Sequence, residues 1–376
     1  MLKQLLSHDL PRSRWLALLL VLIVLGLLLV PFVLPGSRSL NVAAKILVFI
    51  VLVASYDLLL GYTGIVSFAH TMFFGIGAYG VAIASSRMGA DWLALGTGAG
   101  LALLLSLVLS LVIGLFSLRV KAMFYAMITL AVASAFQTFA SQLSHFTGGE
   151  DGLSFRVPEW LTPSFEPLAQ PLFGVTVDGR LITYYLVFAV ALGLVLLMLR
   201  IVNSPFGRVL QAIRENDFRA EAIGYRTVVY RTLSNVLSAL FATLAGCLLA
   251  LWLRYNGPDT SLSFEIMLDI LLIVVIGGMG TIYGAVVGSA LFVLAQNYLQ
   301  DLMRAASGAV EGVGLLSQLI SPDRWLLWLG VLFVLCVYHF PSGIVGRLRQ
   351  AARAASMAPP ASTPTPVQAA ETAPVR

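Results

Sequence analysis

Ionisable side chains inside long apolar segments are the residues of this sequence best placed to do chemistry. Asp57, His70 and Asp269 each stand among uncharged residues. In a membrane such a group faces the bundle interior or a watery cavity, where it can bind an ion, carry a proton or line a path. His70 and Asp269 would suit a proton or sodium site. A hydrogen bond between helices would equally satisfy His70, and Asp57 lies close enough to the end of its segment to reach water. Lys45, near an outer end, is expected to extend toward the headgroups.

Two glycine-rich segments lie in opposite halves of the chain. Residues 61–80 read GYTGIVSFAHTMFFGIGAYG, and residues 277–284 read GGMGTIYG. Glycine lets membrane helices pack closely, and it also marks helix breaks beside a cavity, so both interpretations stay open. The residues that we predict to line or gate a path are Asp57, Gly61, Gly64, Ser67, His70, Gly75, Gly77, Asp269, Gly277, Gly278 and Gly280.

Residues 204–224, SPFGRVLQAIRENDFRAEAIG, are predicted to form a short amphipathic helix. Ser204 suits the N-cap, Pro205 the first helical position, and Gly224 the left-handed position after the helix. Apolar residues recur on one face, and charges of both signs fill the remainder. A helix that lies on anionic lipid would carry mainly Lys and Arg, so the mixed charge favours docking to a cytoplasmic protein.

Motifs for catalysis and for nucleotide binding are missing from the sequence. None of the three lysines (Lys3, Lys45 and Lys121) follows a glycine, so no GxxxxGK[ST] phosphate loop exists, and HExxH and GxSxG are absent too. Cys247 and Cys336 stand alone in apolar stretches, which supports neither a disulfide framework nor a zinc site. We therefore expect a non-enzymatic chain with no cofactor or metal of its own.

Composition indicates which elements must position these residues. Of 376 residues, 59% are hydrophobic and 11% are charged, which is too apolar for a soluble domain and excludes a disordered chain. The net charge of +5 is spread thinly, so a nucleic-acid partner is not expected. Long unbroken apolar runs exclude a transmembrane barrel. The predicted fold class is an all-α polytopic membrane protein.

About ten transmembrane helices are predicted, with both termini in the cytoplasm, because most Lys and Arg then fall in cytoplasmic segments. Residues 15–34 are predicted to be a retained span and not a cleaved signal peptide. Around a membrane domain at 15–340 we predict a cytoplasmic N-terminus at 1–14, an outer loop at 143–180, and a cytoplasmic tail at 341–376 that is disordered from about 357. The spans are 15–34, 42–60, 64–85, 92–118, 122–142, 181–201, 228–253, 265–277, 283–300 and 325–340.

Five segments, in order, carry a family resemblance. The chain resembles the membrane permease subunits of bacterial branched-chain amino acid ABC importers over roughly residues 42–300. The segments are GYTGIVSFAHTMFFGIGAYG (61–80), FYAMITLA (124–131), TGGEDGL (147–153), SPFGRVLQAIREND with AEAIGY (204–225), and VVIGGMGTIYGAVVGSAL (274–291).

The resemblance implies a multi-pass protein of the bacterial inner membrane that works with several partners. These are a second homologous permease subunit, two cytoplasmic ATPases that hydrolyse ATP with Mg, a periplasmic binding protein, and membrane lipid. The 204–224 helix would be the coupling helix that contacts the ATPase, through Pro205, Phe206, Gly207, Arg208, Ala212, Arg214, Glu215, Glu221 and Gly224. The outer gate or binding-protein contact would comprise Thr147, Gly148, Gly149, Glu150, Asp151 and Gly152.

The resemblance also implies the cargo, namely leucine, isoleucine and valine. Similar importers carry urea, short amides or other amino acids, which remain alternatives. A different class, an ion-coupled secondary transporter that uses Asp269 and His70, would leave the charged 204–224 helix without an evident purpose.

Overall fold

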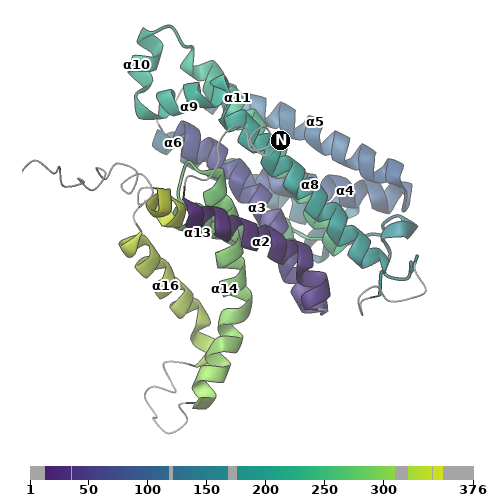
Figure 1. Cartoon of the computed structure of the whole chain (residues 1–376). Coiled ribbons are helices and arrows are strands. Elements are labelled where there is room, and N and C mark those ends of the chain that lie inside the picture. The colour runs from purple at the N-terminus through teal and green to yellow at the C-terminus, as the bar shows by residue number, and fades with distance from the viewer. Residues whose placement is uncertain are drawn as a thin grey trace, which may run out of the picture.

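A computed structural model of the chain describes residues 13–34, 36–117, 122–167, 176–309, 321–340 and 342–349. The predicted N-terminal segment before residue 13, part of the outer loop (168–175) and the tail from residue 350 lie outside the described residues. The described chain is a bundle of helices (Figure 1). Its one sheet pairs two-residue strands, β1 (Leu153–Ser154) antiparallel to β2 (Tyr255–Asn256).

Each of the ten predicted spans corresponds to one described helix, which confirms the all-α polytopic fold. The helices are α2 (Arg14–Val33), α3 (Ser37–Thr63), α4 (His70–Met88), α5 (Trp92–Ser117), α6 (Ala122–Gln142), α8 (Gly179–Val202), α11 (Thr227–Leu253), α13 (Phe264–Gly277), α14 (Ile282–Ala309) and α16 (Trp325–His339).

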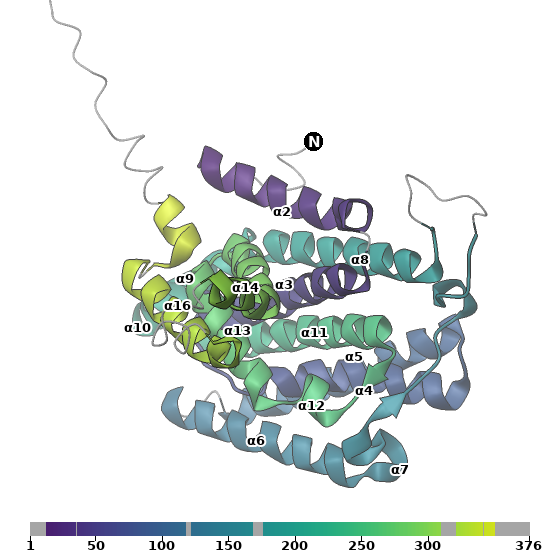
Figure 2. The same cartoon turned by 90° about the horizontal axis from the view of Figure 1, so that it is seen from below.

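Nine helices of the described ranges are long and apolar enough to cross a membrane, and α4 is not among them. Its histidine, serines and glycines lower its hydropathy. Nevertheless α4 runs beside α5 and α11 through the bundle (Figure 2). The polar character of α4 follows from burial among helices, since side chains that do not face lipid need not be apolar.

Helix α3 is the centre of the core. From residue 42 to its end nearly every side chain is buried, and the helix packs against α8, α11 and α14. Small residues let the neighbouring helices approach. Gly77 of α4 lies against the Thr243 carbonyl of α11, and Gly246 of α11 lies against the Phe74 carbonyl of α4. Ser238 of α11 donates a hydrogen bond to the Ser55 carbonyl of α3 at 2.7 Å. These close contacts match the packing of membrane helices through small residues.

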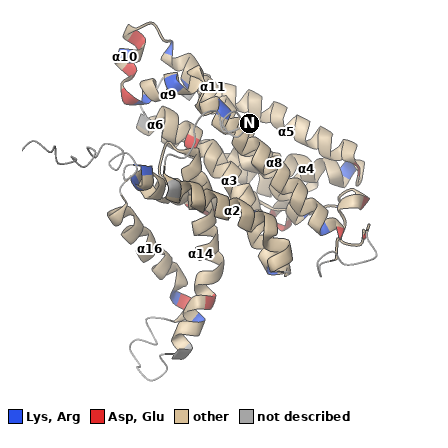
Figure 3. Ribbon diagram, in the orientation of Figure 1, with Lys and Arg blue, Asp and Glu red and all other residues tan. Residues whose placement is uncertain are grey.

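The chain has two chemically distinct ends. At one end lie two short helices, α9 (Pro205–Glu215) and α10 (Asp217–Ala222), where charged residues of both signs gather (Figures 1 and 3). At the other end lie α7 (Ser144–Thr147), β1 and the 3₁₀ turns η1 (Gly149–Asp151) and η2 (Glu159–Leu161) (Figure 2). We call the α9–α10 end the inner end, as the charge bias predicts, and the other the outer end.

Two predicted helices have different bounds in the structure. The span predicted at 64–85 begins at His70, because Gly64 takes a left-handed conformation (φ 73°) that ends α3, and residues 64–69 are not helical. The single helix predicted at 204–224 is two helices. Asn216 is extended, and its Oδ1 accepts a hydrogen bond from Arg219 N at 2.9 Å, so it ends α9 and caps α10.

The remaining described elements are short. A single helical turn, α12 (Pro258–Ser261), joins β2 to α13, and a 3₁₀ turn, η3 (Pro322–Arg324), precedes α16. Many leucines and other large apolar side chains on α2, α5, α6 and α16 are exposed. A bundle with such faces is stable only when lipid or another subunit covers them.

Candidate functional site: an inner junction, a polar pocket and an outer turn

Helix α9 is held against the bundle by its apolar face. Ser204 is the N-cap residue and Pro205 occupies the first turn, as predicted. The Ser204 hydroxyl donates to the Ile201 carbonyl at 2.6 Å, so it makes no capping hydrogen bond to α9. The Phe206 ring stacks on Tyr230 of α11 at 5.8 Å, and Gly207 lies against the Val202 carbonyl. Phe206 and Gly207 therefore seat the helix. The exposed members of the predicted contact set are Pro205, Arg208, Ala212, Arg214, Glu215, Glu221 and Gly224.

Helix α10 is fixed to the start of α11 by two polar contacts. Asp217 pairs with Arg231 at 3.0 Å, and Glu221 accepts a hydrogen bond from the Thr227 hydroxyl at 2.6 Å. Gly224 has φ 97°, as its predicted position after the helix requires. Phe218, which sequence reasoning missed, projects from α10 with 84% of its surface exposed. An aromatic residue outside the apolar stripe of an amphipathic helix was the available signal.

One cluster joins α9 to the ends of α3 and α14, and we call it the inner junction: Asp57, Gly61, Arg214 and Gly280. The Arg214 guanidinium donates to the Gly61 carbonyl. Asp57 is only 1% exposed, and its Oδ1 accepts a hydrogen bond from Gly280 N at 2.8 Å. A β-carbon on Gly61 would overlap the Asp57 carboxyl and Gly280 N, so only glycine fits. Asp57 therefore does not reach water but holds a turn.

The turn that Asp57 holds connects α13 to α14. Gly278 (φ 113°) and Gly280 (φ 79°) take backbone conformations that favour glycine. The Thr281 hydroxyl donates to the Gly278 carbonyl at 2.8 Å, and Gly277 packs on Gly284. The connection between α13 and α14 is thus a structured turn, and it belongs to the same junction as Gly61.

The other predicted path residues of the first glycine segment lie between helices. His70 is 2% exposed, and its Nε2 is 2.8 Å from the Ser55 hydroxyl of α3. Ser67 is buried and accepts from Ala69 N at 3.3 Å. Gly64 lies against the Arg214 side chain, Gly75 against Leu262 and Gly77 against Thr243. These contacts favour the packing interpretation for Gly75 and Gly77 and the hydrogen-bond interpretation for His70.

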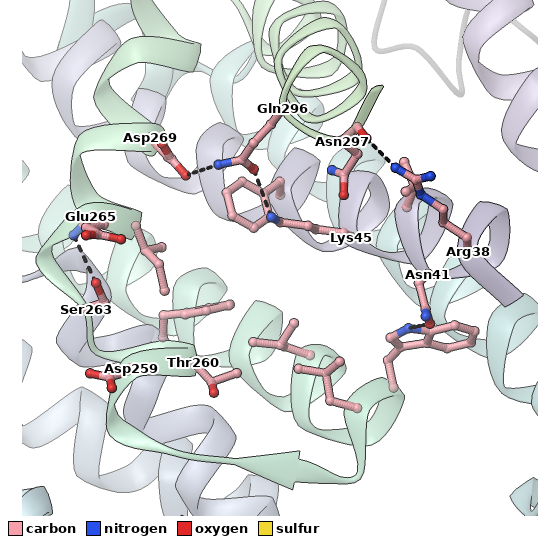
Figure 4. A pocket seen from close by; sticks show the side chains of 17 residues that line it. Arg38, Asn41, Lys45, Asp259, Thr260, Ser263, Glu265, Asp269, Gln296 and Asn297 are labelled. Carbon is pink, nitrogen blue, oxygen red and sulfur yellow. Dashed lines mark hydrogen bonds between the residues drawn. The ribbon is translucent and has the colours of Figure 1, made fainter. Parts of the chain in front are cut away.

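Asp269 lies in a cavity of about 560 Å³ that residues of α3, α4, α11, α12, α13 and α14 line (Figure 4). Its Oδ2 accepts a hydrogen bond from Gln296 Nε2 at 3.3 Å. Lys45 does not extend to the headgroups as expected, because its Nζ donates to Gln296 Oε1 at 2.9 Å and lies 5.4 Å from the Phe49 ring centre. Among the described residues, the structure gives His70 and Asp269 no shared partner.

Most polar residues of this pocket were missed by sequence reasoning. Gln296 bonds to Asp269 and to Lys45, and these contacts depend on how α3 and α13 pack on α14. The polar residues that line the cavity are Arg38, Asn41, Lys45, Asp259, Thr260, Ser263, Glu265, Asp269, Gln296 and Asn297. A lysine and an acid in separate apolar segments were the available signal.

The predicted outer gate segment folds as a compact turn after α6. The Thr147 hydroxyl donates to the Ala140 carbonyl at 2.6 Å and accepts from Gly149 N at 3.2 Å. The three glycines of the segment (148, 149 and 152) all have positive φ, and Gly152 lies against the carbonyl of Asn256. Glu150 and Asp151 are exposed. The turn thus presents two carboxylates at the outer end.

Comparison with known proteins agrees with this architecture. The family described as branched-chain amino acid transport system / permease component matches residues 38–337. The high-affinity branched-chain amino acid transport system permease protein LivM of Salmonella typhimurium is 27% identical over 304 residues, which are 77% of this chain and 70% of the relative. LivM of Escherichia coli is 26% identical over 323 residues, 82% of this chain and 74% of that protein.

An archaeal relative is also similar. The probable branched-chain amino acid transport permease protein LivM of Methanocaldococcus jannaschii is 25% identical over 251 residues, 65% of this chain and 67% of the relative. No solved structure matches the chain. The family match spans most of the described bundle, from the start of α3 into α16, and includes the inner junction, the polar pocket and the outer turn. The chain therefore belongs to the family of permease components of branched-chain amino acid transport systems.

Proposed function

We propose that this chain is one of two homologous membrane subunits of a binding-protein-dependent ABC importer for leucine, isoleucine and valine in the bacterial inner membrane. Two cytoplasmic ATPases supply the energy, because the chain has no phosphate loop of its own. ATP and Mg are hydrolysed there, and this chain binds no cofactor. A periplasmic binding protein delivers the amino acid to the outer end.

The observation that carries the proposal is the shape of the inner end. Helices α9 and α10 project from the bundle and carry exposed charges of both signs together with the exposed Phe218 ring (Figure 3). An amphipathic helix with apolar and charged anchors suits a groove on a protein partner. Arg214 reaches back to the Gly61 carbonyl, so a force on α9 acts directly on α3. A docking helix that is bonded to a central span is what an external ATPase needs.

The outer end supports the second part of the proposal. Glu150 and Asp151 are exposed on the turn that Thr147 and its glycines hold rigidly. Fixed carboxylates at the rim steer a partner with complementary charge and set its orientation. A periplasmic binding protein with basic residues around its cleft would fit this surface.

Co-purification tests the assembly. The chain, tagged at its C-terminus and solubilised gently, should bring down a second permease chain and a Walker-A ATPase. Replacement of Arg214 and Glu215 by alanine should weaken the ATPase but not the second permease. The matched control is Asp323→Ala with Arg324→Ala, an adjacent exposed pair of opposite charge in η3. Recovery of the chain alone, or equal loss of ATPase in both variants, would contradict the proposal.

A further inference from the structure

The polar pocket contains a chain of three side chains from three helices. Lys45 of α3 donates to Gln296 of α14 at 2.9 Å, and Gln296 donates to Asp269 of α13 at 3.3 Å (Figure 4). An ammonium group is only a donor and a carboxylate only an acceptor. The Gln296 carboxamide therefore has one possible orientation, with its oxygen toward Lys45 and its NH₂ toward Asp269. A cation and an anion are thus held one carboxamide apart inside the cavity.

An α-amino acid, like the Gln296 carboxamide, carries a hydrogen-bond acceptor close to a hydrogen-bond donor. Its carboxylate accepts, as the Gln296 oxygen does, and its ammonium donates, as the Gln296 NH₂ does. In the amino acid both groups are charged, and charge-assisted hydrogen bonds are roughly twice as strong as neutral ones. We propose that this pocket is a transient binding site for the zwitterionic backbone of the transported amino acid, which displaces Gln296 and lies between Lys45 and Asp269.

Lys45, and not Arg38, is the cation that would bind the substrate carboxylate, because Arg38 already has an anionic partner. Arg38 pairs with Asp301 at 2.7 Å and donates to the Asn297 carbonyl at 2.8 Å, on the rim of the cavity. Among the described residues, Lys45 has the neutral Gln296 as its hydrogen-bond partner, together with the Phe49 ring. A neutral partner and an aromatic face leave this partly buried ammonium without an anion bonded directly to it, and the carboxylate of an amino acid supplies one.

The rest of the cavity suits a branched aliphatic side chain. Phe49, Phe74, Leu249 and Ile266 contribute apolar surface beside the charged groups. The cavity volume of about 560 Å³ is within the range of about 300–1,000 Å³ that is typical of small-molecule sites. An apolar wall next to Lys45 and Asp269 favours a hydrophobic zwitterion over urea or a sugar, which carry no opposed charges. The site lies toward the outer end of α3, where a delivered substrate first enters the bundle.

The inference rests on the proposed function, and one set of variants separates the two. The complete complex in proteoliposomes, with ATP and the binding protein, is assayed for uptake of labelled leucine. Asp269→Asn and Lys45→Met should each lower uptake about tenfold or more, since each removes a hydrogen bond between charged groups. Gln296→Glu should lower leucine uptake similarly, because its fixed carboxylate pairs with the Lys45 ammonium and competes with the carboxylate of the substrate. Asp323→Asn, which changes an exposed acid outside the cavity, is the control.

A structural role for the three-residue chain gives a different pattern. Gln296→Ala separates the two roles, because it removes both hydrogen bonds of the three-residue chain but leaves Lys45 and Asp269 in place. A purely structural chain would lose uptake in Gln296→Ala, whereas a site from which the substrate displaces Gln296 would keep it. Each variant is checked for retained subunits by co-purification, and the subunits recovered should match those of the unmodified chain. Normal uptake by Gln296→Glu, or by Asp269→Asn and Lys45→Met together, overturns the inference and leaves the importer assignment intact. If the unmodified complex with ATP takes up no branched-chain amino acid, the proposed function itself fails.

Photolabelling tests the same inference on the unmodified complex, so its result does not depend on whether a variant folds. A diazirine analogue of leucine, irradiated during turnover, should label peptides that contain residues 45–49, 265–269 or 296 of this chain. Excess unlabelled leucine should suppress the label, and an analogue without the amino group should not label. Label recovered on this chain only outside these segments, while uptake of leucine proceeds, would overturn the inference.

Discussion

Replacement of Asp57 by alanine should separate the turn of α13–α14 from α3. The Asp57 carboxyl is almost fully buried and accepts from Gly280 N at 2.8 Å. Alanine leaves this amide without its acceptor in a site closed to water. A buried donor that loses its partner costs about 1–3 kcal/mol, so the free energy of unfolding should fall by about 2 kcal/mol. Asp57→Asn keeps a carbonyl oxygen in place, and it should lose about 1 kcal/mol.

The assay is reversible unfolding of the purified chain in mixed micelles with a rising fraction of SDS, followed by tryptophan fluorescence. The matched control is Asp301→Ala. Its partner Arg38 and Asp301 itself are 61% and 40% exposed, and such a surface pair contributes about 0–1 kcal/mol. The reasoning is refuted if Asp57→Ala loses no more stability than Asp301→Ala. Equal losses in Asp57→Ala and Asp57→Asn would likewise show that the acceptor for Gly280 is not what matters.

Three shorter predictions concern the docking helices, the junction and the outer turn. Phe218→Ala should weaken ATPase retention about thirtyfold, as expected for an exposed aromatic anchor worth about 2 kcal/mol, in a titration of ATPase onto the membrane subunits. Phe146→Ala, equally apolar but at the outer end and 53% exposed, should change retention little. Gly61→Ala should lower stability by about 1–3 kcal/mol, because its methyl group overlaps backbone, whereas Gly193→Ala meets nothing within 4 Å and should not. Thr147→Val should leave a buried amide unpaired, and faster hydrogen exchange at that turn would detect it.

Long segments with few charges were sufficient to predict the helices but not their breaks. In lipid the backbone groups of a segment must bond to one another, and the nine strongly apolar segments and the less apolar α4 are all helices. The end of α3 at Gly64 and the break at Asn216 depend on single residues that also occur inside helices. The Asn216 side chain accepts a hydrogen bond from Arg219 N, which competes with continuation of the helix. A hydrophobic pattern does not encode this competition.

The candidate sites divide in the same way. Asp57, Gly61, Arg214 and Gly280 were each predicted, but as members of two separate sites, because only tertiary packing brings α9 against the end of α3. Gln296 was not predicted at all. Amides also occur at 297 and 300, so Gln296 is unremarkable in sequence, and its role depends on the lysine and the acid that α3 and α13 place on either side of it.

The inner junction and the polar pocket share the same three helices. Asp57 and Lys45 are twelve residues apart on α3, or about 18 Å along the helix. Helix α13 carries Asp269 and ends at the turn, and α14 carries Gln296 and begins there. The Asp57 carboxyl bonds α3 to that turn, so a tilt of α3 that follows a movement of α9 pivots at this bond. Such a tilt changes the distance of Lys45 from Asp269 and Gln296.

This geometry predicts a measurable motion. Spin labels at Ser37 on α3 and Leu302 on α14, both exposed, should change their separation when the assembled complex binds ATP. In Asp57→Ala the turn is released from α3, so the change should be smaller, and leucine uptake per ATP hydrolysed should fall with it. If Asp57→Ala shows the same change in label distance as the unmodified protein but loses uptake, then Asp57 does not act through the motion of α3 relative to α14. An ATP-dependent change of equal size and equal uptake in both proteins would mean that the junction does not connect the ATPase to the pocket.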